Sequence, residues 1–236
     1  MDETRTWLIT GSSRGLGLEF VRQLTSSPYN IVIATCRNPE KADSLRSLRP
    51  IPESTLHIVQ LDISDASSIQ AAKDKVSEIL GDKGLDYLIN NAAINNGNDT
   101  PFNFSVQGFR DTFYTNVVGT SMVAATLSPL IEKSNRKVII NMNSGLGSIG
   151  LDAGPANMTY SASKAALNMV TYKQTVSRRD FVCLSVDPGW CKTDMGGKDA
   201  DLEPSESVAG ILKLATTVTT ENSGKFYRYD GEELPW

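Results

Sequence analysis

The chain has 236 residues, of which 40% are hydrophobic and 21% are charged, a balance typical of folded globular proteins that excludes a disordered chain. Asp and Glu number 27 against 23 Lys and Arg, and the net charge of −4 argues against general nucleic-acid binding, which needs a basic face. No apolar run approaches the roughly 18 residues of a membrane-spanning helix, so no membrane partner is expected.

Short apolar strands alternate with amphipathic helices along the sequence. In chain order we expect a strand at 7–10, a helix at 15–26, a strand at 31–35, a weak helix at 38–48, a strand at 56–61, a helix at 66–80, a strand at 85–90, a helix at 108–131, a strand at 137–142, a helix at 157–177, a strand at 181–186, a helix at 205–219 and a strand at 225–229. This alternation predicts an α/β protein with a single Rossmann-fold domain over residues 1–236. Its doubly wound parallel sheet should have about seven strands with helices on both faces, and ligands should bind beyond the carboxyl ends of those strands.

A glycine-rich turn follows the first strand. Gly11, Gly15 and Gly17 would allow a tight turn, close approach to a pyrophosphate and close helix packing, and Ser13, Arg14 and Leu16 lie between them. The helix that follows presents free N–H groups to phosphate. An ordinary βα turn is the alternative, but the position directly after the first strand favours dinucleotide binding.

The end of the second strand bears on the choice of cofactor. Cys36 stands where enzymes that prefer NAD usually place an acid, and Arg37 follows it. Arg37 and Arg14 of the glycine loop suit the 2′-phosphate of NADPH, because guanidinium binds phosphate in a bidentate way. The alternative is that both are solvated surface arginines.

The third and fourth strands end in further candidates for the cofactor. Asp62 is expected to accept from the adenine amino group with Ile63 against the ring, although a turn aspartate is common at such a place. Asn91 and Ala92 close the fourth strand, where small residues leave room for a cofactor and an Asn side chain can hold irregular backbone.

The main candidate for chemistry is Tyr160 with Lys164, which lie one helical turn apart. A free tyrosine has a pKa of about 10. An ammonium about 4 Å away contributes roughly 4 kcal/mol at an effective dielectric of about 20, enough to lower that pKa by about three units. Tyr160 would then exchange a proton near neutral pH. The preceding strand ends in Ser144, whose hydroxyl could bond a substrate carbonyl oxygen.

These motifs together resemble the short-chain dehydrogenase/reductase family over essentially the whole chain. The resemblance is carried by Thr10-Gly11-x-x-x-Gly15-x-Gly17, Asn90-Asn91-Ala92, Asn116, Ser144, Tyr160-x-x-x-Lys164 and Pro188-Gly189-x-x-x-Thr193. The segments 141–144, 188–197 and 224–236 look like the C-factor and sniffer-type carbonyl reductase branch.

The resemblance implies roles for these residues. Tyr160 would be the general acid/base, Lys164 would lower its pKa and bind the nicotinamide ribose, and Ser144 would orient the substrate oxygen, with Ser148 as its rival. Asn116 would hold a water that links Lys164 to solvent. The residues implied to contact the nicotinamide end are Pro188, Gly189, Cys191 and Thr193.

The function that follows is NADPH-dependent reduction of ketone, aldehyde or quinone carbonyls. The alternative is a signalling or regulatory protein of the same fold with little or no turnover. The segment 194–204 is rich in small and charged residues, with Pro204 and a Ser205 cap opening the next helix. We therefore expect an open, partly solvated site, unless Trp190 and Phe102 wall it.

Composition also bears on location and partners. Three cysteines without a CxxC pair and a single histidine, His57, disfavour disulfide scaffolds and metal sites and favour a reduced, cytoplasmic environment. No signal-peptide layout opens the sequence. The apolar helices at 108–131 and 157–177 could pair across a two-fold axis in a homo-oligomer.

Overall fold

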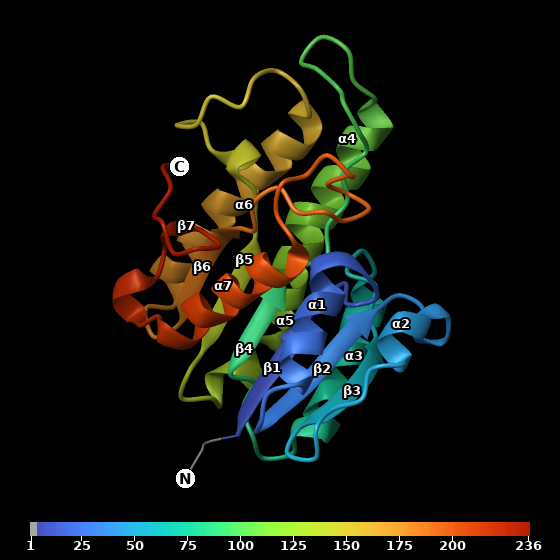
Figure 1. The fold of residues 1–236 in the computed structure, drawn as a ribbon. Helices are drawn as coiled ribbons and strands as arrows, with labels where there is room; N and C mark the ends of the chain where they lie inside the picture. The colour runs from blue at the N-terminus through green and yellow to red at the C-terminus, as the bar shows by residue number, and fades with distance from the viewer. Residues whose placement is uncertain (1–3) are drawn as a thin grey trace.

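A computed structural model describes residues 4–236, whose strands form one parallel sheet. Across the sheet the strand order is β3-β2-β1-β4-β5-β6-β7 (Figure 1). The strands are β1 (Arg5–Ile9), β2 (Asn30–Cys36), β3 (Thr55–Gln60), β4 (Tyr87–Asn90), β5 (Val138–Met142), β6 (Val182–Asp187) and β7 (Phe226–Arg228). The predicted seven-stranded doubly wound sheet is confirmed, and the strand order reverses between β1 and β4.

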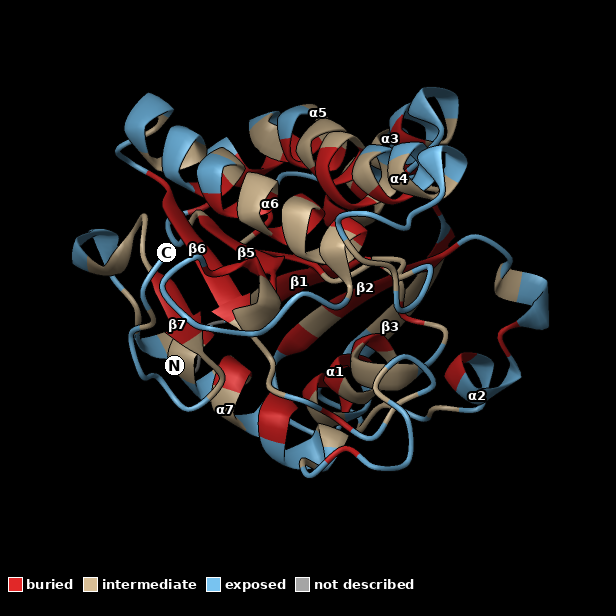
Figure 2. Cartoon of the chain, turned by 90° about the horizontal axis from the view of Figure 1, so that it is seen from above, coloured by how far each residue is buried: buried red, intermediate tan, exposed pale blue. Residues whose placement is uncertain are grey.

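Helices cover both faces of this sheet, as Figure 2 shows. On one face lie α1 (Gly15–Thr25), α2 (Asp43–Arg46) and α7 (Pro204–Thr217). On the other face lie α3 (Ala66–Leu80), α4 (Val106–Phe113), α5 (Thr120–Glu132) and α6 (Met158–Ser177). Short 3-10 turns are η1 (Pro39–Lys41), η3 (Gly145–Gly147) and η4 (Thr220–Asn222).

The core has two halves because side chains of a strand alternate between the two faces. Trp7 and Ile9 of β1 pack into the half that holds Phe20 of α1, whereas Leu8 packs into the half that holds Val76 of α3. Strands covered on both faces are mostly apolar, which is why β2 and β5 contain the apolar runs 31–34 and 138–140.

The expected helix at 108–131 is interrupted. A π-helical segment, η2 (Tyr114–Gly119), separates α4 from α5. Within it the Asn116 side chain binds the Ile94 backbone through both its oxygen and its nitrogen, at 2.9 Å each. Gly119 packs so closely that a Cβ there would lie 2.4 Å from the Ile63 carbonyl oxygen. These tertiary contacts override the regular helical repeat.

Two other expectations need correction. The weak helix at 38–48 consists only of η1 and α2, which bury just Leu45 and so have little apolar face to hold a longer helix. At the start of α7, Pro204 takes the first helical turn and Glu203 the capping position without a side-chain bond, so Ser205 is not the cap.

Candidate active site

A cleft of about 340 Å³ opens at the carboxyl ends of the strands. It is lined by Gly11, Ser13, Arg14, Gly15, Leu16, Cys36, Arg37, Leu61, Asp62, Ile63, Ser64, Asn91, Ala92, Ala93, Ile94, Thr115, Met142, Asn143, Tyr160, Lys164, Pro188, Thr193, Asp194 and Met195. These residues come from segments that follow β1 to β6 and from η2 and α6, so the topology gathers them at the point where the strand order reverses.

The glycine loop after β1 leaves room that a side chain would fill. Gly11 has a φ of 71°, and a Cβ on it would lie 2.9 Å from the Ala92 Cα. A Cβ on Gly17 would lie 2.2 Å from the Gly11 carbonyl oxygen, so α1 packs directly against the loop. The position before α1 offers no side-chain cap, which leaves the first N–H groups of that helix free for an anion in the cleft.

The β4 loop is held against the glycine loop. The hydroxyl oxygen of Thr10 accepts from the backbone N–H of Asn91 at 2.9 Å and of Ala92 at 3.0 Å. The Asn91 amide in turn donates to the Thr10 carbonyl oxygen at 2.9 Å. Asn91 therefore acts on the backbone of the loop, and both walls of the cleft keep a fixed spacing.

The two arginines expected near a 2′-phosphate both line the cleft. Arg14 is paired with Asp194 at 3.2 Å, and both side chains are largely exposed. The Asp62 carboxylate accepts from the backbone N–H of Ser64 at 2.9 Å and from its hydroxyl at 2.6 Å. Asp62 is thus a turn aspartate, and it also lines the cleft. A glycine cradle, a free helix N-terminus and two guanidinium groups fit a phosphorylated dinucleotide.

Tyr160 and Lys164 stand together on α6, and both line the cleft. The Lys164 Nζ lies 5.4 Å from the centre of the Tyr160 ring and donates to the Met142 carbonyl oxygen at 2.7 Å. Burial lowers the pKa of Lys164 to about 8, and the negative charge of Asp187 opposes that change.

The pKa of Tyr160 departs from its ordinary value in the opposite direction to our expectation. Burial raises it, and the Asp187 carboxylate raises it further. The expected lowering by Lys164 assumed an ammonium aimed at the phenol, whereas this ammonium is bonded to the Met142 carbonyl. In this structure Tyr160 therefore holds its proton.

Ser144 and its rival Ser148 have different surroundings. Ser144 follows β5, its backbone N–H donates to the Asn143 side chain at 2.9 Å, and its hydroxyl oxygen accepts from the Leu146 N–H at 3.2 Å. Its hydroxyl proton is left for another acceptor. The Ser148 hydroxyl donates to the Pro235 carbonyl oxygen at 2.7 Å, which favours Ser144 for the substrate-orienting role.

Five expected site residues do not line the cleft themselves: Gly17, Asn116, Ser144, Gly189 and Cys191. Gly17 lies behind the glycine loop, and Asn116 holds the Ile94 backbone while also donating to the Ser163 hydroxyl at 3.1 Å. Gly189 donates its N–H to Asp187, and the Cys191 thiol donates to the Pro188 carbonyl oxygen at 3.2 Å. These residues support the walls of the cleft.

Other residues that line the cleft were not predicted from the sequence. Met195 and Asp194 follow directly on Thr193, and Thr115 precedes Asn116, so proximity to a motif was their only signal. Phe102 and Trp190, the alternative walls of the substrate site, are 100% and 56% exposed and do not line the cleft. The expectation of an open site on this edge is consistent with that exposure.

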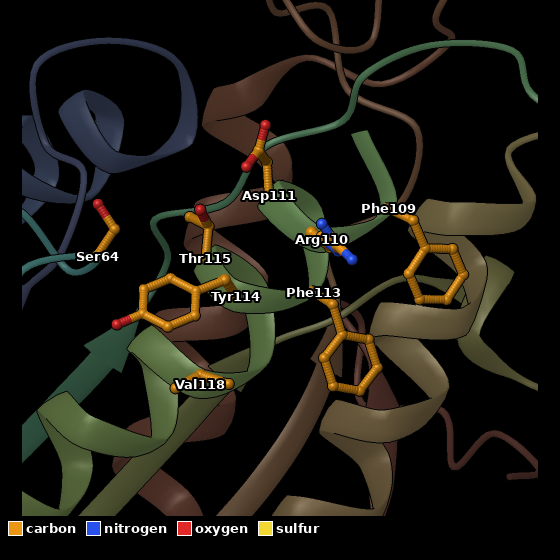
Figure 3. A pocket seen from close by; sticks show the side chains of 8 residues that line it. All are labelled: Ser64, Phe109, Arg110, Asp111, Phe113, Tyr114, Thr115 and Val118. Atoms are coloured by element: carbon orange, nitrogen blue, oxygen red, sulfur yellow. The ribbon is translucent and has the colours of Figure 1, made fainter. Parts of the chain in front are cut away.

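A second hollow, of about 760 Å³, lies on the outer surface of α4 and η2 (Figure 3). Phe109 and Phe113 stack with ring centres 6.1 Å apart at one side, and Tyr114 points toward Ser64 at the other. Ser64 and Thr115 line both this hollow and the cleft. The hollow therefore adjoins the cleft at Ser64 and Thr115.

Among residues 4–236, no helix combines the length and apolar character needed to cross a bilayer. In the same described range, the His, Cys, Asp and Glu side chains form no cluster suited to holding a metal ion.

Comparison with known proteins agrees with this geometry. The family model for short chain dehydrogenases matches residues 5–203. The NADPH-bound carbonyl reductase from chicken fatty liver is 34% identical with a TM-score of 0.92, over 100% of this chain and 96% of that one. The carbonyl reductase Sniffer of Drosophila melanogaster is 33% identical with a TM-score of 0.93, over 99% of this chain and 100% of that one.

A third relative is the C-signal protein of Myxococcus xanthus, which is 32% identical over 64% of this chain and 93% of its own length. The expected likeness to the C-factor and sniffer-type branch is thus confirmed. Together with the glycine loop and the Tyr160-x-x-x-Lys164 pair in one cleft, these matches show that the chain belongs to the short-chain dehydrogenase family of oxidoreductases.

Proposed function

We propose that the protein is an NADPH-dependent carbonyl reductase that acts on ketones, aldehydes or quinones. The observation that carries the proposal is that Tyr160 and Lys164 line the same cleft as the glycine loop. A proton donor thus lies in a site whose glycine loop suits a dinucleotide. The cytoplasmic location expected from the sequence belongs to the same proposal.

NADPH supplies a hydride when it is bound. Tyr160 donates its proton to the carbonyl oxygen, and its raised pKa keeps that proton in place until negative charge develops on the substrate. The Ser144 hydroxyl donates to the same oxygen and fixes its position. Lys164 holds a positive charge behind Tyr160, which stabilises the phenolate that remains.

The preference for NADPH is part of the proposal. Arg37 and Arg14 face the cleft where the adenosine ribose would lie, and the residue at the end of β2 is Cys36 in place of an acid. Two guanidinium groups favour the extra phosphate. The chicken relative carries NADPH, which supports the same choice.

The likeness to C-signal supports a second candidate function, in which the protein is regulatory and binds the cofactor with little turnover. The test is a screen of purified protein for NADPH oxidation against ketones, aldehydes and quinones. We expect turnover with several flat or small carbonyl compounds. Tight NADPH binding without turnover of any of them would refute the reductase and favour the regulatory function.

A further inference from the structure

The carboxyl end of β6 places a partly buried acid beside the catalytic pair. We propose that Asp187 is a positioning residue of this active site: its carboxylate joins the Ser144 loop to the Pro188–Gly189 turn and sets a negative charge behind Tyr160 and Lys164. The inference rests on the proposed reductase function, because it assigns a role within that same site.

The contacts of Asp187 bridge two loops that follow neighbouring strands. Its Oδ1 accepts from the Gly189 N–H at 3.1 Å. The carboxylate also accepts from the backbone N–H of Gly145, the residue after Ser144, and a Cβ on Gly145 would lie 3.4 Å from Asp187 Oδ2. One carboxylate therefore fixes the loop that orients the substrate oxygen and the turn expected at the nicotinamide.

The charge of Asp187 is only partly balanced by its neighbours. The charged and titratable groups that act on it or feel it are Tyr160 and Lys164 of α6, Arg228 of β7 and Cys191 of the following loop. Arg228 is the register partner of Asp187, but its guanidinium is bonded to Asp230 and Glu232 at 2.6 Å each. Arg228 still lowers the pKa of Asp187 more than Lys164 does, so the charge of Asp187 acts on both β7 and α6.

The sign of that field favours proton donation. A negative charge stabilises the ammonium of Lys164 and destabilises the phenolate of Tyr160, so it raises the pKa of both. Burial raises the pKa of Asp187, and the two backbone N–H bonds and the nearby cations offset this only in part. With Asp187 ionised, Tyr160 keeps its proton and Lys164 keeps its charge, which suits reduction more than alcohol oxidation.

The test compares Asp187→Asn with Asp180→Asn, an exposed carboxylate that precedes the same strand and pairs with Arg178 and Lys137. The first readout is the NMR titration of isotope-labelled lysine in protein without cofactor or substrate, with Lys164 assigned by its loss in Lys164→Ala. The midpoint for Lys164 should fall by about half a pH unit or more in Asp187→Asn and stay unchanged in Asp180→Asn. Equal midpoints in wild type and Asp187→Asn would overturn the proposal.

The second readout is the pH profile of carbonyl reduction. Its alkaline limb should move to lower pH in Asp187→Asn, whereas a merely structural loss would lower turnover at every pH alike.

If Asp187→Asn does not fold, Asp187→Glu carries the test. The charge is kept, so the Lys164 midpoint stays, and the displaced carboxylate lowers turnover at least about threefold. Wild-type turnover in Asp187→Glu would overturn the positioning role. A wild-type protein that reduces no carbonyl compound would refute the proposed function. The Lys164 titration would still show whether the charge of Asp187 acts on Lys164.

Discussion

Asp99 caps the helix that carries Tyr160, although it lies in the loop after β4. Both of its carboxylate oxygens accept from the Thr159 N–H at 3.2 Å, and the Thr159 hydroxyl donates to one of them. Asn157, the residue before α6, has a φ of 58° and makes no side-chain cap. The start of the helix that carries Tyr160 therefore depends on Asp99, an acid remote in the chain. Asp99 holds Thr159, the residue directly before Tyr160.

The cost of Asp99→Ala follows from these contacts. Loss of a helix cap costs about 1 kcal/mol, and loss of a carboxylate at a helix N-terminus adds about 0.3–1 kcal/mol. The sum of about 1.3–2 kcal/mol corresponds to a fall of about 3–8 °C in melting temperature for a domain of this size. Tyr160 directly follows the capped residue Thr159, so loss of the cap should disturb the position of the Tyr160 side chain. We therefore also expect turnover to fall about threefold or more.

The assay pairs thermal unfolding with steady-state carbonyl reduction. Asp65→Ala is the matched control, because Asp65 caps α3 by accepting from the Ser67 N–H at 2.9 Å and lies outside the cleft. Asp65→Ala should lower the melting temperature and leave turnover unchanged. An Asp99→Ala protein with wild-type melting temperature and wild-type turnover would refute the capping role.

Two further predictions concern the cofactor cleft. Arg37→Asp should reduce the preference for NADPH over NADH by about tenfold or more, because it replaces a phosphate partner with a repelling charge; equal ratios of dissociation constants in variant and wild type would count against the phosphate contact. Gly17→Ala should cost about 1–3 kcal/mol and weaken NADPH binding, because its Cβ would lie 2.2 Å from the Gly11 carbonyl oxygen. Unchanged unfolding and calorimetric binding would show that the loop yields.

The sequence predicted the sheet because its signals are local. Apolar runs such as 31–35 mark strands covered on both faces, and Ala66–Leu80 has the predicted bounds because Asp65 caps it from within the same segment. The interruption at η2 could not be predicted, since it follows from the contact of Asn116 with Ile94, which lies 22 residues away in the chain.

The candidate site likewise combines features that local sequence patterns predict with features that depend on long-range contacts. The cleft residues belong to motifs that can be recognised in the sequence, but the roles of their neighbours depend on long-range contacts. Asp99 reaches Thr159 across 60 residues, and no local pattern indicates it. The pKa of Tyr160 was predicted with the wrong sign, because spacing on a helix does not reveal burial or the direction of the Lys164 ammonium. One signal in the sequence was not used to predict the site: Asp187 is a carboxylate that directly precedes the Pro188-Gly189 motif.

The most direct test of the reductase proposal compares turnover in Tyr160→Phe and Tyr172→Phe. Tyr172 lies on the same helix with its side chain about half exposed, so its variant controls for a change on α6 outside the cleft. With NADPH and an accepted carbonyl compound, Tyr160→Phe should lose about 10²-fold or more in turnover while its dissociation constant for NADPH stays close to that of wild type. Tyr172→Phe should match wild type in both. Carbonyl reduction by Tyr160→Phe at the wild-type rate would contradict the central claim that Tyr160 donates the proton.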